Sequence, residues 1–175
     1  MSPAIAFATA PSSCAGARTN RRGNVPSSSC IPMAADSFDL ARFVQAQDPV
    51  MDQVRLELRA GHKRSHWMWF VFPQLSGLGH SVVAQRYGIA GLAEAHAYLR
   101  HPVLGSRLVE CSDLVCTVPA RSISQIFGAP DDLKFHSCMT LFSLLPDAAV
   151  VFTAALDQYF GGKSDPLTME KLGRL

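Results

Sequence analysis

The sequence predicts an all-α protein, a single compact domain of about seven or eight short helices. Hydrophobic residues make up 48% of the 175 residues, which is enough to bury a core. Apolar side chains recur at helical spacing in one segment after another, and Gly, Pro and Ser residues separate these segments. No segment shows the alternation of a strand or the turn of a hairpin. We therefore expect short helices joined by short connections.

The first two helices follow from spacing and from residues that start or stop helices. Segment 38–47 places apolar residues on one helical face, with Asp36 or Ser37 available as the N-cap. Segment 49–60 has Pro at its first position and apolar side chains four residues apart, and Gly61 ends it. The second helix is the most clearly marked in the chain.

Segment 63–74, KRSHWMWFVFPQ, has a continuously apolar middle, so that periodicity assigns it to neither helix nor strand. Because the rest of the chain is helical, we expect a helix from Ser65, as N-cap, to about Phe72, ended by Pro73.

Five further segments carry helical patterns bounded by Gly, Pro or a capping residue. Asp131 and Asp132 lie in the first turn of one of them, where carboxylates complement the helix dipole. The five segments are 81–100, 104–118, 129–146, 148–162 and 165–172.

Residues 1–35 differ in composition from the rest and are set apart from the predicted domain, 36–175. They are rich in Ser, Ala and Pro, contain three Arg and no acidic residue, and lack a secretory apolar core. This profile predicts an organellar transit peptide, with the abundance of Ser favouring a plastid over a mitochondrion. The alternatives are a disordered tail, or an internal start at Met33 and a cytoplasmic protein.

Charge and hydropathy exclude several functional classes. The domain is nearly neutral, because three of the 16 Lys and Arg lie in the N-terminal segment, and no basic stripe supports nucleic-acid binding. The longest apolar stretch, 148–156, is far below the roughly 20 residues that cross a bilayer, so no membrane partner is expected. Five cysteines without a C-x-x-C pair indicate reduced thiols.

Two short patterns are better explained by structure than by chemistry. His62 and His66 are spaced i, i+4, but no third ligand follows at a suitable spacing, and we expect no metal and no cofactor. GGKS at 161–164 ends like a phosphate-binding loop, yet Asp157 stands where that loop needs Gly, so a helix stop is the better interpretation.

Several segments together resemble the domain of unknown function 1810 family, often labelled "calpastatin": LARFVQAQDPV, ELRAGHKRSHWMWFVFPQLSGLGHS, AEAHAYLRHPVLGSRL, IFGAPDDLKFHSCMTLF and LDQYFGGKSDPLTMEKL. The resemblance covers about residues 38–172. It implies a stand-alone helical domain found mostly in bacteria, here as an organelle-targeted descendant. His136 and Cys138 depart from the family pattern. Calpastatin itself inhibits through disordered repeats, so protease inhibition is not expected of this apolar, non-repetitive chain.

The candidate site combines the aromatic segment 63–74 with segment 131–140. Aromatic rings stack planar groups, cations hold phosphate and a Gln amide offers a donor and an acceptor, although the rings could equally fill the core and the first turn of 131–140 could simply be solvated. The expected ligand-binding residues are Lys63, Trp67, Trp69, Gln74, Arg86 and Lys134. We expect His66, Trp69, Gln74 and Asp132 to converge in one cavity.

Two functions remain open, and the sequence does not decide whether the protein is an enzyme. The first is action on a nucleotide-like or ADP-ribose-like molecule by N-glycosidic hydrolysis, since DDLKF and FGG are loosely similar to helical N-glycosidases of the NADAR type. His66 would then protonate the leaving group and Asp132 would stabilise an oxocarbenium-like centre or orient water. The alternative is a non-catalytic module that binds a phosphorylated small molecule or a protein. The oligomeric state is not predicted.

Overall fold

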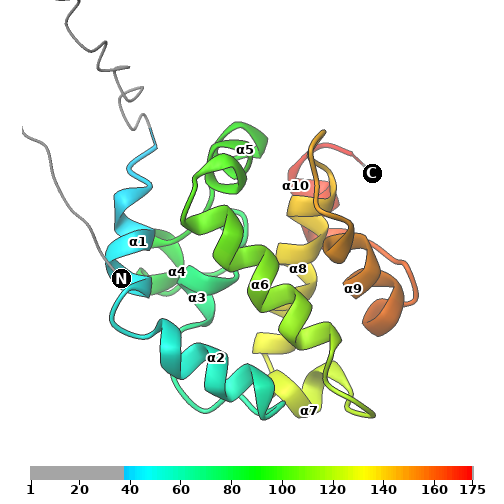
Figure 1. Ribbon diagram of the computed structural model, residues 1–175. Helices are drawn as coiled ribbons and strands as arrows, with labels where there is room; N and C mark the ends of the chain where they lie inside the picture. Colours follow the sequence, from blue (N-terminus) through cyan, green and yellow to red (C-terminus); the bar gives the residue numbers. More distant parts are fainter. Residues whose placement is uncertain (1–37, 175) are drawn as a thin grey trace, which may run out of the picture. The chain divides into compact units, whose positions relative to one another are not determined.

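The computed structural model describes residues 38–174, which form ten helices and no strand (Figure 1). The all-α prediction is confirmed, and the count slightly exceeds the expected seven or eight because three of the helices have only four or five residues. The helices are α1 (Ala41–Gln47), α2 (Met51–Arg59), α3 (Met68–Val71), α4 (Val82–Arg86), α5 (Leu92–Arg100), α6 (Leu104–Cys116), α7 (Ile123–Phe127), α8 (Asp131–Ser143), α9 (Val150–Phe160) and α10 (Pro166–Lys171). The predicted transit peptide, 1–35, and the predicted caps Asp36 and Ser37 lie outside the described residues.

Helices α4 and α7 are short, and each begins at a serine whose side chain caps it. Ser81 starts α4, as predicted, and its hydroxyl accepts the N–H of Ala84 at 3.1 Å. Ser122 and Gln125 form a reciprocal capping box at α7, a helix that the sequence pattern did not reveal. No helix within residues 38–174 combines the length and apolar character needed to cross a bilayer.

The helix predicted from Ser65 to Phe72 is much shorter than expected. Only Met68–Val71 is helical, because residues 64 and 65 bind a carboxylate instead of starting a helix. Glu57 accepts the backbone N–H groups of Arg64 and Ser65 at 2.9 and 3.1 Å. The Ser65 hydroxyl also donates to Glu57, and Trp67 stands at the N-cap position of α3 in place of the predicted Ser65.

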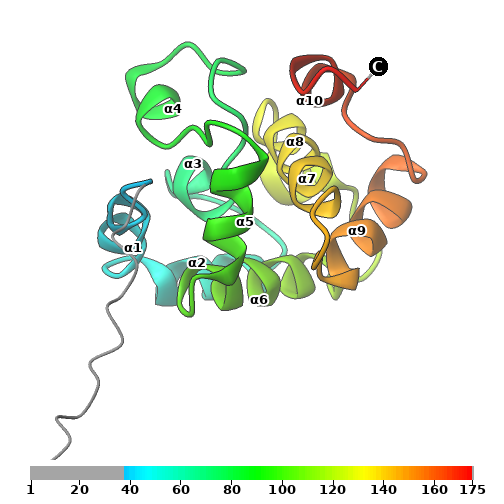
Figure 2. The same ribbon diagram turned by 90° about the horizontal axis from the view of Figure 1, so that it is seen from above.

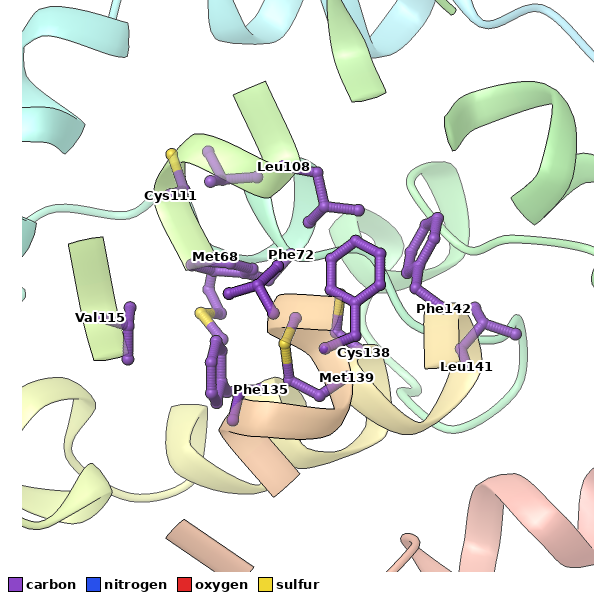
Figure 3. Packing of buried hydrophobic residues seen from close by; sticks show 14 of the residues in the cluster. Met68, Phe72, Leu108, Cys111, Val115, Phe135, Cys138, Met139, Leu141 and Phe142 are labelled. Carbon is purple, nitrogen blue, oxygen red and sulfur yellow. The ribbon is translucent and has the colours of Figure 1, made fainter. Parts of the chain in front are cut away.

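Helix α8 lies at the centre of the described residues. It packs against α9 on one side and α5 on another, and it also contacts α3, α7 and α10 (Figure 2). Its side chains are buried on nearly every face, as expected of a helix enclosed by others. Figure 3 shows Phe135, Cys138, Met139 and Phe142 of α8 among the buried side chains.

Helices α5 and α6 approach closely at Gly105. A Cβ atom at this position would lie 1.8 Å from the backbone oxygen of Leu99, so only glycine fits. Between the two helices, His101 Nδ1 accepts the N–H groups of Val103 and Leu104. The helix end predicted at His101 is thus confirmed, and the ring of the same residue binds backbone N–H groups at the start of α6.

A single pair of backbone contacts fixes the segment that follows α3. Leu75 and Ile89 form an isolated parallel bridge, in which Ile89 donates to Gln74 at 2.9 Å and accepts from Ser76 at 2.8 Å. These bonds hold residues 74–76 against the chain that follows α4. They position one wall of the cavity described next.

Candidate functional site

One cavity brings together two of the predicted ligand-binding residues, Gln74 and Lys134. It lies between the start of α8, the start of α10 and segment 74–79, and its volume is about 360 Å³. We call it the α8–α10 cavity. Its lining residues are Gln74, Leu78, Gly79, Pro130, Leu133, Lys134, Ser137, Asp165 and Leu167.

Helix α8 supplies a mixed apolar and polar face to this cavity. Because an α-helix turns by roughly 100° per residue, Leu133, Lys134 and Ser137 share one side of α8. Leu133 is 63% exposed, and Leu167 of α10 is 61% exposed. The cavity therefore combines apolar walls, to which both leucines contribute, with a few polar groups.

Lys134 belongs to a charged group that carries a net positive charge. Its Nζ lies 2.7 Å from Oδ1 of Asp131, while Nζ of Lys63 lies 2.7 Å from Oδ2 of the same carboxylate. Burial alone would raise the pKa of Asp131, but the ammonium groups of Lys134 and Lys63 more than offset this and lower the pKa. Lys134 Nζ also lies 4.5 Å from the ring centroid of Trp69, a cation–π distance.

Only one of the two carboxylate oxygens of Asp165 is hydrogen-bonded within the described part of the protein. Its Oδ2 accepts the N–H and the hydroxyl of Thr168 at 2.9 and 2.6 Å, and the hydroxyl of Ser137 at 2.9 Å. Its Oδ1 has no hydrogen-bond partner among residues 38–174. Since every fully buried side-chain N or O atom of the described residues does have a partner, Oδ1 is open to the cavity that Asp165 lines.

Trp67 and Trp69 have different roles, which answers whether the aromatic segment is core or wall. Trp67 is 1% exposed, its Nε1 donates to Oε2 of Glu57 at 2.8 Å, and its ring packs against Phe72 and Phe127. The prediction that Trp67 stacks on a ligand is wrong, because the ring has no accessible face. Trp69 is half-buried, with the ammonium of Lys134 above its ring.

Glu57 is the residue that organises this segment, and no pattern in the sequence indicates this role. Burial of the carboxyl group by itself would raise its pKa. Hydrogen bonds from Arg64, Ser65, Gln53 and Trp67 more than offset this and lower the pKa of Glu57 to about 2. The carboxylate therefore stays ionised and holds the loop that carries Lys63 and Trp67.

The other predicted site residues lie apart from the cavity lining. His66 is exposed and makes no hydrogen bond or ion pair with another residue of the described chain. Asp132 accepts the hydroxyl of Ser124 at 2.6 Å and the N–H of Leu133 at 2.9 Å, so it joins α7 to the first turn of α8. The guanidinium of Arg86 is exposed and lies 5.6 Å from the ring centroid of Tyr87.

The expected convergence of four residues in one cavity is therefore not observed. Of His66, Trp69, Gln74 and Asp132, only Gln74 is among the residues that line the α8–α10 cavity. Trp69 is connected to it through Lys134. Asp132 fails to reach it because it lies on α8 opposite the face that carries Leu133 and Lys134.

Residues 38–174 also form two hollows and contain free thiols away from the α8–α10 cavity. A hollow of about 980 Å³ borders α5 and α6, and one of about 580 Å³ borders α7 and α9, and neither is lined by a predicted site residue. No group of three or more His, Cys, Asp or Glu side chains is placed to hold a metal ion in this part of the chain. Cys111 is a free thiol whose pKa burial raises to about 12, so it is not a nucleophile at neutral pH.

Sequence reasoning missed Ser137 and Asp165 as cavity residues. The predicted helix over 165–172 is present, and Asp165 is the N-cap of α10, followed by Pro166. Nothing in the neighbouring sequence indicates that its second oxygen faces a cavity. That position depends on the packing of α10 against α8.

One comparison with known proteins identifies the family, and another supports the fold. Residues 37–172 match the family model described as "Protein of unknown function (DUF1810)". The crystal structure of the conserved hypothetical protein Rv1873 from Mycobacterium tuberculosis is similar, with 59% sequence identity and a TM-score of 0.77. The match covers 79% of this chain and 99% of that one. Among curated proteins, none matches the chain.

Proposed function

The chain belongs to the DUF1810 family of proteins of unknown function, and on that premise we propose that it is a small-molecule-binding domain. Its ligand is a phosphorylated molecule that also carries hydroxyl groups, such as a nucleotide or a sugar phosphate. The family assigns no chemistry, so the proposal depends on the residues of the α8–α10 cavity.

The single observation that carries the proposal is that Lys134 and Asp165 line the same cavity. Lys134 shares the carboxylate of Asp131 with a second ammonium group, that of Lys63, so its charge is not fully compensated. A phosphate group can bind there. Oδ1 of Asp165 can accept a hydrogen bond from a ligand hydroxyl, and the apolar walls can pack against a ring.

The size of the cavity favours a small ligand. About 360 Å³ lies at the lower end of the roughly 300–1,000 Å³ typical of small-molecule sites. A mononucleotide or a sugar phosphate suits this volume better than the larger ADP-ribose.

The contacts of the expected catalytic residues favour binding without turnover. A general acid must reach the leaving group, and His66 is not among the residues that line the cavity. Both oxygens of Asp132 are occupied by Ser124 and by the start of α8. N-glycosidic hydrolysis by these two residues is therefore the less favoured function, and it remains testable in the same experiment.

Titration calorimetry with ribose 5-phosphate and AMP tests the proposal. We expect saturable binding by the native protein, weakened about tenfold or more by Lys134→Gln, because a charge-assisted hydrogen bond contributes about 1.5–3 kcal/mol. Asp165→Asn keeps an N-cap and should weaken binding of both hydroxyl-bearing ligands. Incubation of native protein and Asp132→Asn with AMP, followed by chromatography for free adenine, reports hydrolysis.

Arg86→Gln is the matched control, because it removes one exposed positive charge outside the cavity lining. Its affinity should equal that of the native protein. If Arg86→Gln weakened binding as much as Lys134→Gln, the ligand would bind elsewhere. Failure of the native protein to bind either ligand would exclude the proposed function, and Asp132-dependent release of adenine would favour the enzymatic alternative.

Delivery to an organelle is a separate proposal, supported by the composition of residues 1–35 alone. Fusion of these residues to a fluorescent protein should direct it to plastids. A diffuse cytoplasmic signal would contradict the proposal.

A further inference from the structure

Gln74 places an unpaired amide at the wall of the α8–α10 cavity. The side chain is half-buried and lines the cavity, and its amide makes no hydrogen bond with another described residue. No side-chain N or O atom of residues 38–174 is both fully buried and unpaired, so the amide is accessible. It is an available donor and acceptor beside Lys134.

The backbone at Gln74 is fixed, which places the side chain at the wall of the cavity. The carbonyl of Gln74 accepts the N–H of Ile89 at 2.9 Å, and Ser76 donates to the carbonyl of Ile89 at 2.8 Å. Leu75, between these two bonds, is 3% exposed and belongs to the core. Because the backbone is already ordered, binding a ligand restricts only the side-chain torsions of Gln74.

Gly79 leaves room for the amide on its other side. A Cβ atom at position 79 would lie 3.3 Å from Nε2 of Gln74 and 2.6 Å from Cβ of Ala84. Ala84 is buried in α4, so the chain at Gly79 is confined between that helix and the amide. The absence of a side chain at Gly79 thus lets the backbone pass directly beside the Gln74 amide.

We infer that Gln74 is the specificity-determining residue of the cavity and that the ligand carries a hydrogen-bond donor next to an acceptor, in addition to its phosphate. This inference rests on the proposed function. A neutral amide offers one acceptor and two donors, so it pairs with a group that has the complementary set, such as a carboxamide or the amino edge of adenine. A ligand with a carboxylate in place of the carboxamide could accept from the NH₂ group of Gln74. It would offer no donor to the carbonyl oxygen of Gln74, which would lose its partner.

Two pairs of probes distinguish the sources of this chemistry. AMP and purine riboside 5′-monophosphate differ only in the 6-amino group, and nicotinamide mononucleotide and nicotinic acid mononucleotide differ only in carboxamide against carboxylate. We expect the native protein to bind AMP more tightly than purine riboside 5′-monophosphate, or nicotinamide mononucleotide more tightly than nicotinic acid mononucleotide, or both. The expected difference in affinity is about tenfold. The pair that shows the preference identifies the ligand class.

Gln74→Leu should abolish that preference and change the affinity for ribose 5-phosphate much less, since ribose 5-phosphate lacks the base or carboxamide that the Gln74 amide is inferred to bind. Gln74→Glu keeps the size and removes the donors, and it should weaken the amino-bearing or carboxamide ligand further. Circular dichroism confirms that both variants are folded.

The outcomes separate the two proposals. Lys134-dependent binding of ribose 5-phosphate without a preference within either pair would overturn the inference on Gln74 and leave the proposed function intact. Equal weakening of ribose 5-phosphate by Gln74→Leu would also overturn it, because the side chain would then only shape the cavity. Absence of binding to every probe would overturn both proposals.

Discussion

The indole N–H of Trp67 donates to Oε2 of Glu57 across 2.8 Å, and both side chains are almost completely buried. The same carboxylate binds Arg64 and Ser65, so one buried charge fixes the loop that precedes α3. Lys63, in this loop, reaches Asp131 at the start of α8. The buried carboxylate therefore supports the charged group beside the α8–α10 cavity.

The lowered pKa of Glu57 should make the stability of the protein depend on pH. Its pKa falls from 4.5 to about 2 on folding, which corresponds to about 3 kcal/mol. Because the folded-state pKa is the lower one, this stabilisation is complete above pH 4.5 and is lost as the pH falls towards 2. Urea unfolding of native protein and Glu57→Gln should show a difference in the free energy of unfolding that becomes smaller as the pH falls from 4.5 towards 2. Glu170→Gln, at an exposed carboxyl group, is the control, and parallel pH curves for native protein and Glu57→Gln would contradict the prediction.

Gly105→Ala should destabilise the protein by about 3 kcal/mol or more, because the new Cβ would lie 1.8 Å from the backbone oxygen of Leu99. Relief requires α5 and α6 to move apart. Gly91→Ala is the matched control, since no atom lies within 4 Å of its added Cβ. Thermal unfolding should show a large drop in Tm for the first variant and almost none for the second. Similar Tm values would refute the close approach.

Asp165→Ala should cost more than an ordinary cap substitution. It leaves the two donors of Thr168 and the hydroxyl of Ser137 without their acceptor in a buried site. We expect a loss of about 2–4 kcal/mol in the free energy of unfolding, against about 1 kcal/mol for Ser81→Ala, which removes a single capping bond. Urea unfolding measures both, and equal losses would show that the three bonds to Asp165 contribute little.

The two tryptophans should differ in their access to acrylamide. In Trp69→Phe, the remaining Trp67 is buried and its fluorescence should be almost unquenched. The native protein should show an additional, accessible component from Trp69. Lys134→Ala should increase that component, because the ammonium group lies above the Trp69 ring. Equal quenching of native protein and Trp69→Phe would contradict the different burial of the two rings.

The helices could be predicted because the signals that start, continue and stop them lie within a few residues. Ser81 and Asp165 begin helices, Gly61 and Gly161 follow the ends of others, and the acidic first turn of α8 is present as expected. The helix predicted over 65–72 is shorter than expected because it depends on a distant residue. Glu57 lies outside this segment and binds its first residues, which therefore do not become helical.

The candidate site could be predicted only in part. Gln74 and Lys134 line the α8–α10 cavity, whereas His66, Asp132 and Arg86 do not, and residue type alone could not separate these groups. Asp165 was missed because its cavity-facing oxygen has no signature in the neighbouring sequence.

The sequence by itself determined the helical class, most of the helix positions and the family, since these depend on local spacing and on strings of residues that are specific to one group of proteins. The tertiary structure decided that Trp67 fills the core, that Trp69 lies under Lys134, and that Gln74, Lys134 and Asp165 share a cavity. The physical reason is that a helix is formed by neighbours in the chain, whereas burial and charge pairing are set by whichever distant segment packs against them.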